Sequence, residues 1–227
     1  MKPGIPPEPE HSQFAVRISQ LRDELRAQDP GIVANRSGAT YLTKNSMQGE
    51  FHLPIWEQPA VLSSPGLVGR DLRTGQELSL PVQALLLYYL ITADGAPLSR
   101  RWISFSELPN GKFYNLAYQG YTGKELGRAF QDDLDGFVRV AQNIGGTLEP
   151  NNSPQIPGDR ACSFIAFPRV SSLVAAWRGD EDFPSSFQIL FDASVSHYLP
   201  TDVCAILGSM LTKRLIAAHH LHRSIGP

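Results

Sequence analysis

The spacing of apolar residues divides the chain into helical and extended stretches. Near the N-terminus, four apolar residues recur at helical spacing: Phe14, Ile18, Leu21 and Leu25. This pattern predicts an amphipathic helix from Ser12, its N-cap, to about Gln28, stopped by Pro30-Gly31. Residues 1–11 hold four prolines and predict a flexible arm before that helix.

The next stretch, from Gly38 to Leu78, has a different pattern. Short apolar runs are cut by Gly, Pro and Ser, which is typical of short strands joined by turns. In one of them, residues 51–55, apolar positions alternate with His52 on the opposite face. Because proline cannot donate to a sheet ladder, Pro54 predicts an edge strand or a bulge there.

Three further helical regions follow from capping and periodicity. The first, from Ser79 to Gly95, is apolar almost all round, so we expect it to be buried. The second opens on a capping-box pattern, Thr122-Gly-Lys-Glu125, and breaks near Gln131. The third, from Thr201 to about His222, carries one apolar stripe.

Extended segments lie between these helices. Trp102 to Phe105 alternates as a strand, Pro109-Asn110-Gly111 is a tight turn, and Phe113 to Tyr118 returns as a second strand. Three more strands are expected towards the C-terminus, at residues 162–167, 173–177 and 187–192. If the last two pair as a hairpin, Trp177 lies opposite Phe187. These elements predict a single α+β domain over residues 12–227, with a largely antiparallel sheet packed by amphipathic helices.

Composition and charge exclude several function classes. The chain has 227 residues and a formal net charge of -2, with no basic block, so a nucleic-acid interface is not expected. Its longest apolar run, Ala84 to Ile91, is too short for a bilayer, which takes about 20 residues. The N-terminus has no apolar core of a secretory signal. We therefore expect a cytoplasmic protein without membrane contact, in which homo-oligomers are possible.

A cluster of acids between two strands is the first candidate site. Asp180, Glu181 and Asp182 are consecutive, and Asp192 ends the following strand on the face of Gln188. Clustered carboxylates suit a hard cation or general-base chemistry. The alternative is a solvated hairpin loop in which Asp180 caps its own turn.

Histidines and cysteines give weaker signals. His219 and His222 are three apart on one helical face, which is compatible with a metal, but no partner ligand is evident. Cys162 and Cys204 are isolated among apolar neighbours and form no cluster motif. The simplest interpretation is two buried thiols in a reducing compartment.

An aromatic-rich stretch is the other candidate. Trp102 and Glu107 precede the Pro-Asn-Gly turn, and Phe113, Tyr114, Tyr118 and Tyr121 follow it. Aromatic side chains with polar tips suit either the core or the wall of a flat-ligand site.

Several motifs, among them WISFSELPNG, GDRACSFIAFPR and AAWRGDEDFPSSFQILFD, resemble an uncharacterised prokaryotic family, the Domain of Unknown Function 3786 family. The resemblance covers roughly Leu78 to Leu215. It marks nine signature positions: Trp102, Glu107, Pro109, Gly111, Asp180, Glu181, Phe183, Pro184 and Asp192. Some members carry a cysteine-rich iron–sulfur segment or are linked to corrinoid proteins. This chain lacks that segment, so no iron–sulfur cluster is expected, and the resemblance implies no catalytic residues.

Three functions are compatible with these residues. The first, which we favour, is a non-catalytic binding or accessory domain for a cofactor (a corrinoid or another tetrapyrrole) or for a partner protein. The second is a metal-assisted enzyme, which requires Glu107, Asp180 and Glu181 to converge. The third is an oligomerisation module with an exposed apolar patch and no cavity. The candidate binding residues are Trp102, Glu107, Trp177, Asp180, Glu181, Asp182 and Asp192.

Overall fold

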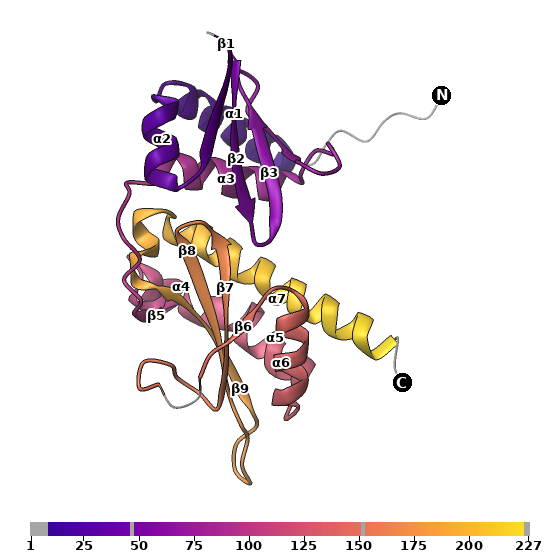
Figure 1. Ribbon diagram of the computed structural model, residues 1–227. Helices are drawn as coiled ribbons and strands as arrows, with labels where there is room; N and C mark the ends of the chain where they lie inside the picture. The colour runs from indigo at the N-terminus through magenta and orange to yellow at the C-terminus, as the bar shows by residue number, and fades with distance from the viewer. Residues whose placement is uncertain (1–8, 46–47, 151–152, 225–227) are drawn as a thin grey trace. The chain divides into compact units, whose positions relative to one another are not determined.

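The computed structural model describes residues 9–45, 48–150 and 153–224 (Figure 1). Contacts within the chain group it into two compact units, Met1–Leu53 with Gln58–Gly95 and Pro54–Glu57 with Ala96–Pro227. Both combine helices with antiparallel strands, which confirms the α+β class. The domain boundaries stay a prediction, and the two units are described separately. Among the described residues, no helix combines the length and apolarity that crossing a membrane requires.

The first unit is a four-stranded sheet with helices on one face (Figure 1). Its elements are α1 (Pro9–Arg26), α2 (Pro30–Ser37), β1 (Thr40–Asn45), β2 (Gln48–Ile55), β3 (Gln58–Ser63), β4 (Val68–Asp71) and α3 (Leu80–Thr92), and the strand order is β1-β2-β3-β4. Helix α3 packs against α1 and buries Leu85, Leu86 and Leu87, as its all-round apolar sequence predicted.

Three details of this unit differ from the sequence-based expectation. The first helix begins at Pro9 rather than Ser12, so part of the predicted arm is helical; residues 1–8 lie outside the described residues. The first helix does end before Pro30, at Arg26, but Pro30 also opens a second helix, α2, which the Asp29 carboxylate caps by accepting from the Ile32 N–H at 2.9 Å. Strand β2 is central, not an edge. Pro54 is tolerated there because the pairing with β1 ends at His52.

The second unit is a five-stranded sheet in the order β5-β9-β8-β7-β6. Its elements are β5 (Trp102–Ser104), the 3-10 helix η1 (Phe105–Glu107), α4 (Gly111–Tyr121), α5 (Gly123–Phe130), α6 (Leu134–Asn143), β6 (Thr147–Leu148), β7 (Arg160–Phe167), β8 (Val170–Trp177), β9 (Ser186–Asp192), the 3-10 helix η2 (Ala193–His197) and α7 (Thr201–Ser224). On the helical side, Phe187 of β9 packs against Phe130 of α5 and Phe137 of α6.

The β8–β9 hairpin was predicted correctly as an antiparallel pair, but its register is shifted by one residue. Trp177 pairs with Ser186, and Phe187 pairs with Ala176 instead. In this register the small Ser172 and Ala176 lie opposite the large Phe191 and Phe187, so the bulky rings fit against the helices without crowding their partners. Trp177 therefore points to the opposite face from Phe187.

The segment after the Pro-Asn-Gly turn is helix α4, so the predicted second strand at residues 113–118 is wrong. Asn110 does adopt a positive φ of 60°, but the turn leads into a helix. Gly111 sits so close to the carbonyl oxygen of Phe105 that a Cβ would overlap it. Tyr114, Tyr118 and Tyr121 then share one helical face.

The predicted capping box at Thr122 also fails. The Thr122 hydroxyl donates to the carbonyl of Tyr118 at 2.6 Å, and its side chain makes no cap hydrogen bond to α5. The helical region does break at Gln131 as expected, where φ is 48°.

Replacing Gly111 with alanine tests the close contact between Gly111, at the start of α4, and the carbonyl oxygen of Phe105. We expect Gly111→Ala to lower the free energy of unfolding by about 1–3 kcal/mol, because the added methyl group forces the backbone of η1 away. Gly120→Ala is the matched control on the same helix, since no atom lies within 4 Å of a Cβ there. Urea denaturation of both variants measures the difference, and equal stabilities would contradict the packing described for Gly111.

Candidate functional site

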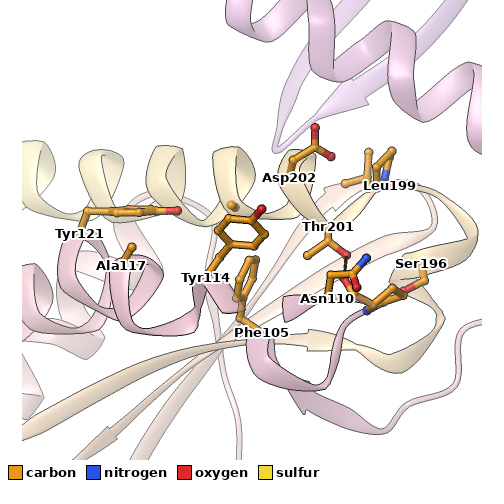
Figure 2. Close-up of a pocket in the computed structure, with 12 residues that line it drawn as sticks. Phe105, Asn110, Tyr114, Ala117, Tyr121, Ser196, Leu199, Thr201 and Asp202 are labelled. Carbon is orange, nitrogen blue, oxygen red and sulfur yellow. Dashed lines mark hydrogen bonds between the residues drawn. The ribbon is translucent and has the colours of Figure 1, made fainter. Parts of the chain in front are cut away.

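The second unit contains a pocket of about 600 Å³ between two walls that are distant in sequence (Figure 2). One wall is η1 with α4 along its length to Tyr121, and the other is the end of η2 with the first two turns of α7. The residues that line it are Phe105, Pro109, Asn110, Tyr114, Ala117, Tyr121, Ser196, Leu199, Pro200, Thr201, Asp202 and Ala205. This size and this apolar lining are typical of small-molecule sites.

Aromatic rings form the first wall. Phe105 stacks on the fully buried Tyr118, with ring centroids 4.1 Å apart, and Tyr118 meets the edge of Tyr121 at 5.7 Å. Tyr114 is 65% exposed and Tyr121 is 41% exposed, so both rings are accessible to a ligand. Burial raises the pKa of Tyr121, which keeps its hydroxyl neutral at physiological pH.

The hydroxyl group of Tyr118 lies beneath this wall without a hydrogen-bond partner among the described residues. Burial, followed by the nearby Cys204 and Tyr121, raises its pKa well above the usual value. A Cβ at Gly208 of α7 would overlap this hydroxyl. The glycine therefore allows α7 to approach the floor of the aromatic wall.

Polar groups lie on the second wall and at the turn. Asn110 occupies the left-handed turn before α4, and Ser196 is exposed near the end of η2. The Thr201 hydroxyl donates to the carbonyl of Pro109 at 2.8 Å and joins the two walls directly (Figure 2). Asp202 follows in the first turn of α7, with an exposed side chain.

Behind the pocket, Asp192 joins the segments from which both walls start. Its carboxylate accepts from the backbone N–H groups of Ser99, Arg100 and Ser194 at 3.0, 2.7 and 2.9 Å. It also accepts from the hydroxyls of Ser99 and Ser194 at 2.9 and 2.6 Å. Burial alone would raise the pKa of Asp192, but the donors from Ser194 and Ser99 outweigh it and the net shift is downward.

Helix α4 also presents apolar side chains away from the pocket. Phe113 is 85% exposed and Leu116 is 79% exposed, and neither lines the cavity. They provide neighbouring positions at which a substitution leaves the pocket lining unchanged.

The structure places the predicted site residues in three separate locations. Trp102 pairs with Asp192 across β5 and β9, and Trp102 and Trp177 both pack on a small cluster on the sheet face away from the helices. Glu107 lies at the end of η1 and accepts from the backbone N–H and hydroxyl of Ser104 at 2.7 and 2.9 Å. These two bonds lower its pKa.

The third location is the acidic loop, which projects beyond the end of the sheet between β8 and β9 (Figure 1). One carboxylate oxygen of Asp180 accepts from the N–H groups of Asp182 and Phe183 at 3.0 and 2.8 Å. This is the turn expected if the loop is solvated, and Glu181 and Asp182 are exposed. A ligand-binding role for the three acids stays a prediction.

No cluster of three or more His, Cys, Asp and Glu side chains that could hold a metal occurs among the described residues. Glu107 and the Asp180 loop are therefore not brought together as a metal site. His219 is buried against Phe130, with ring centroids 4.6 Å apart, whereas His222 is exposed. Cys162 and Cys204 are buried free thiols, and burial raises the pKa of Cys162 to about 12.

Comparison with known proteins gives one match. Residues 29–214 match the family described as Domain of unknown function (DUF3786). The chain belongs to the DUF3786 family. No curated protein matches it, and no solved structure does. The matched region of this DUF3786 chain includes every residue that lines the pocket.

Sequence reasoning missed Asp202 as a lining residue of this DUF3786 protein, and it named Tyr121 only as part of the aromatic-rich stretch. Both residues lie at a helix terminus: Tyr121 ends α4, and Asp202 lies in the first turn of α7. Helix termini are visible in a sequence, but which termini meet is decided by the chain's path through the sheet.

Asp192 is open to a direct test in this DUF3786 chain. We expect Asp192→Asn to lower the free energy of unfolding by about 2–3 kcal/mol, because an amide cannot accept from all five donors. The folded-state pKa of Asp192 is lowered, so its contribution is present above the unfolded value and disappears as pH falls through the folded one. The variant should therefore lose less stability than the wild type on acidification, as measured by urea denaturation between pH 7 and pH 3.

The matched control is Asp180→Asn, where the acceptor of both turn hydrogen bonds is a single oxygen that asparagine retains. It should behave like the wild type. The role given to this carboxylate would be contradicted if Asp192→Asn had the stability of the wild type at pH 7 and lost as much stability as the wild type between pH 7 and pH 3.

Proposed function

We propose that this chain is a non-catalytic binding domain that holds a small, mainly apolar ligand in the pocket between α4 and α7. The observation that carries the proposal is the pocket itself: a concave space of about 600 Å³ whose walls include the rings of Phe105, Tyr114 and Tyr121. Binding sites for small molecules typically measure about 300–1,000 Å³ and combine an apolar lining with a few polar groups. The oligomerisation hypothesis needs no cavity, so the pocket favours binding.

The chemistry of the lining also favours binding over catalysis. It offers two aliphatic hydroxyls, Ser196 and Thr201, but no His, Lys or Cys. A hydroxyl nucleophile needs a base within hydrogen-bond reach. Thr201 donates to a backbone carbonyl instead, and Ser196 has no hydrogen bond to a base among the described residues.

A metal-bearing tetrapyrrole is not supported by these residues. His, Cys and Met, the commoner ligands of a haem iron, are missing from the pocket lining, and tyrosine, at Tyr114 and Tyr121, is the one haem-ligand type that it contains. We therefore derive no role for a corrinoid or haem and propose a metal-free ligand. A cytoplasmic location and an accessory role are part of the proposal. The cytoplasmic location is supported by two buried free cysteines, which suit a reducing compartment.

Two neighbouring aromatic residues of α4 give a matched test. Tyr114 lines the pocket and Phe113 does not, yet both are largely exposed, so either substitution should leave the fold intact. With indole as a neutral flat probe, we expect Tyr114→Ala to weaken binding about fivefold or more, through loss of aromatic contact, and Phe113→Ala to leave it unchanged. Saturation-transfer NMR and titration measure both.

Native mass spectrometry of the protein purified from its own host extends this test. A co-purifying small molecule that is retained by Phe113→Ala and lost by Tyr114→Ala supports the proposal. Indole binding that is absent, or equally affected by both variants, would show that the pocket is not the binding site.

A further inference from the structure

The pocket has an unequal distribution of charge. Among its lining residues, Asp202 carries the one carboxylate, and the others are apolar, amide, hydroxyl or phenol groups. The Asp202 carboxylate forms no hydrogen bond or ion pair with any described residue. No Lys, Arg or His side chain lines the pocket to neutralise it.

The N-terminus of α7 works against this charge but is weaker. A helix N-terminus carries roughly half a positive charge, and Asp202 in its first turn carries a full negative one. The dipole therefore offsets part of this charge without cancelling it. The mouth of the pocket is therefore negative, and an anionic ligand would meet a like charge.

The aromatic wall also favours a positively charged ligand. The faces of Phe105, Tyr114 and Tyr121 carry the negative part of the ring quadrupole, which attracts an organic cation. Figure 2 shows the ring of Tyr114 beside that of Phe105, with its hydroxyl on the side of the pocket where Asp202 lies. Rings and carboxylate are thus two independent contributions to cation binding in one cavity.

We propose that the pocket selects an organic ammonium ligand: a quaternary or methylated nitrogen on an apolar body, with the nitrogen between the tyrosine rings and Asp202. This inference rests on the proposed binding function and specifies its ligand class. A bulky alkylammonium suits the lining because it is weakly hydrated and needs few hydrogen-bond acceptors. The pocket offers many ring carbons and a single carboxylate.

Three probes of similar size test the inference: choline, its uncharged carbon analogue 3,3-dimethylbutan-1-ol, and the anion 3,3-dimethylbutanoate. We expect choline to bind roughly five to ten times more tightly than the neutral alcohol, and the anion to bind most weakly. Titration followed by NMR of the tyrosine resonances gives the three dissociation constants.

Variants separate the two contributions. Asp202→Asn should reduce the preference for choline over the alcohol at least threefold while leaving the affinity for the alcohol unchanged. Tyr121→Ala should weaken both probes. Asp180→Asn, which removes an exposed carboxylate outside the pocket, should preserve the preference for choline.

The outcomes distinguish this inference from the proposed function. If the alcohol or the anion binds as tightly as choline, the ammonium ligand class is wrong while the binding function stands. The same holds if indole binds in the pocket and choline does not. If Asp202→Asn keeps the full preference for choline, the position of the nitrogen beside Asp202 is wrong. If neither indole nor any of the three probes binds there, the proposed function fails as well.

Discussion

The second unit depends on the hydrogen bonds to one buried carboxylate, that of Asp192. The carboxylate accepts from two segments more than ninety residues apart in sequence, at Ser99–Arg100 and at Ser194. The first segment enters β5, and the second opens η2. A buried charge is stable only when its acceptor capacity is filled. Burial of Asp192 therefore requires both segments to be in place.

This constraint positions both walls of the pocket. From the first segment the chain runs through β5 into η1 and α4, and from the second it runs through η2 into α7. Thr201 then joins the walls again through the carbonyl of Pro109. Between these ties the aromatic wall is supported from below by Tyr118, stacked on Phe105. A pocket anchored at its back and floor is largely preformed, which reduces the ordering cost of binding.

The sequence predicted more of the fold than of the site. Strands β7, β8 and β9 follow from short apolar runs, which suit strands buried on both faces, and the long helix α7 follows from its apolar stripe. The segment of α4 was misassigned because a run of aromatics suits a strand as well as a helix, and the burial of Tyr118 against Phe105 decided between them. The hairpin register shifted by one residue for a similar reason: the fit of large rings against small partners depends on the helices behind them.

For the candidate site, the amino-acid sequence by itself determined the chemical ingredients. It showed an aromatic-rich stretch around the Pro-Asn-Gly turn, a strand ending in Asp192, and cysteines that form no cluster motif. The tertiary structure decided their use. Glu107 and Asp180 accept hydrogen bonds from their own turns. Asp192 joins the segments that lead into the two walls, and Asp202 supplies the carboxylate of the pocket lining. Local hydrogen bonds and periodicity are encoded over a few residues, whereas a cavity forms where distant helix ends meet, and only the folded sheet sets that meeting point.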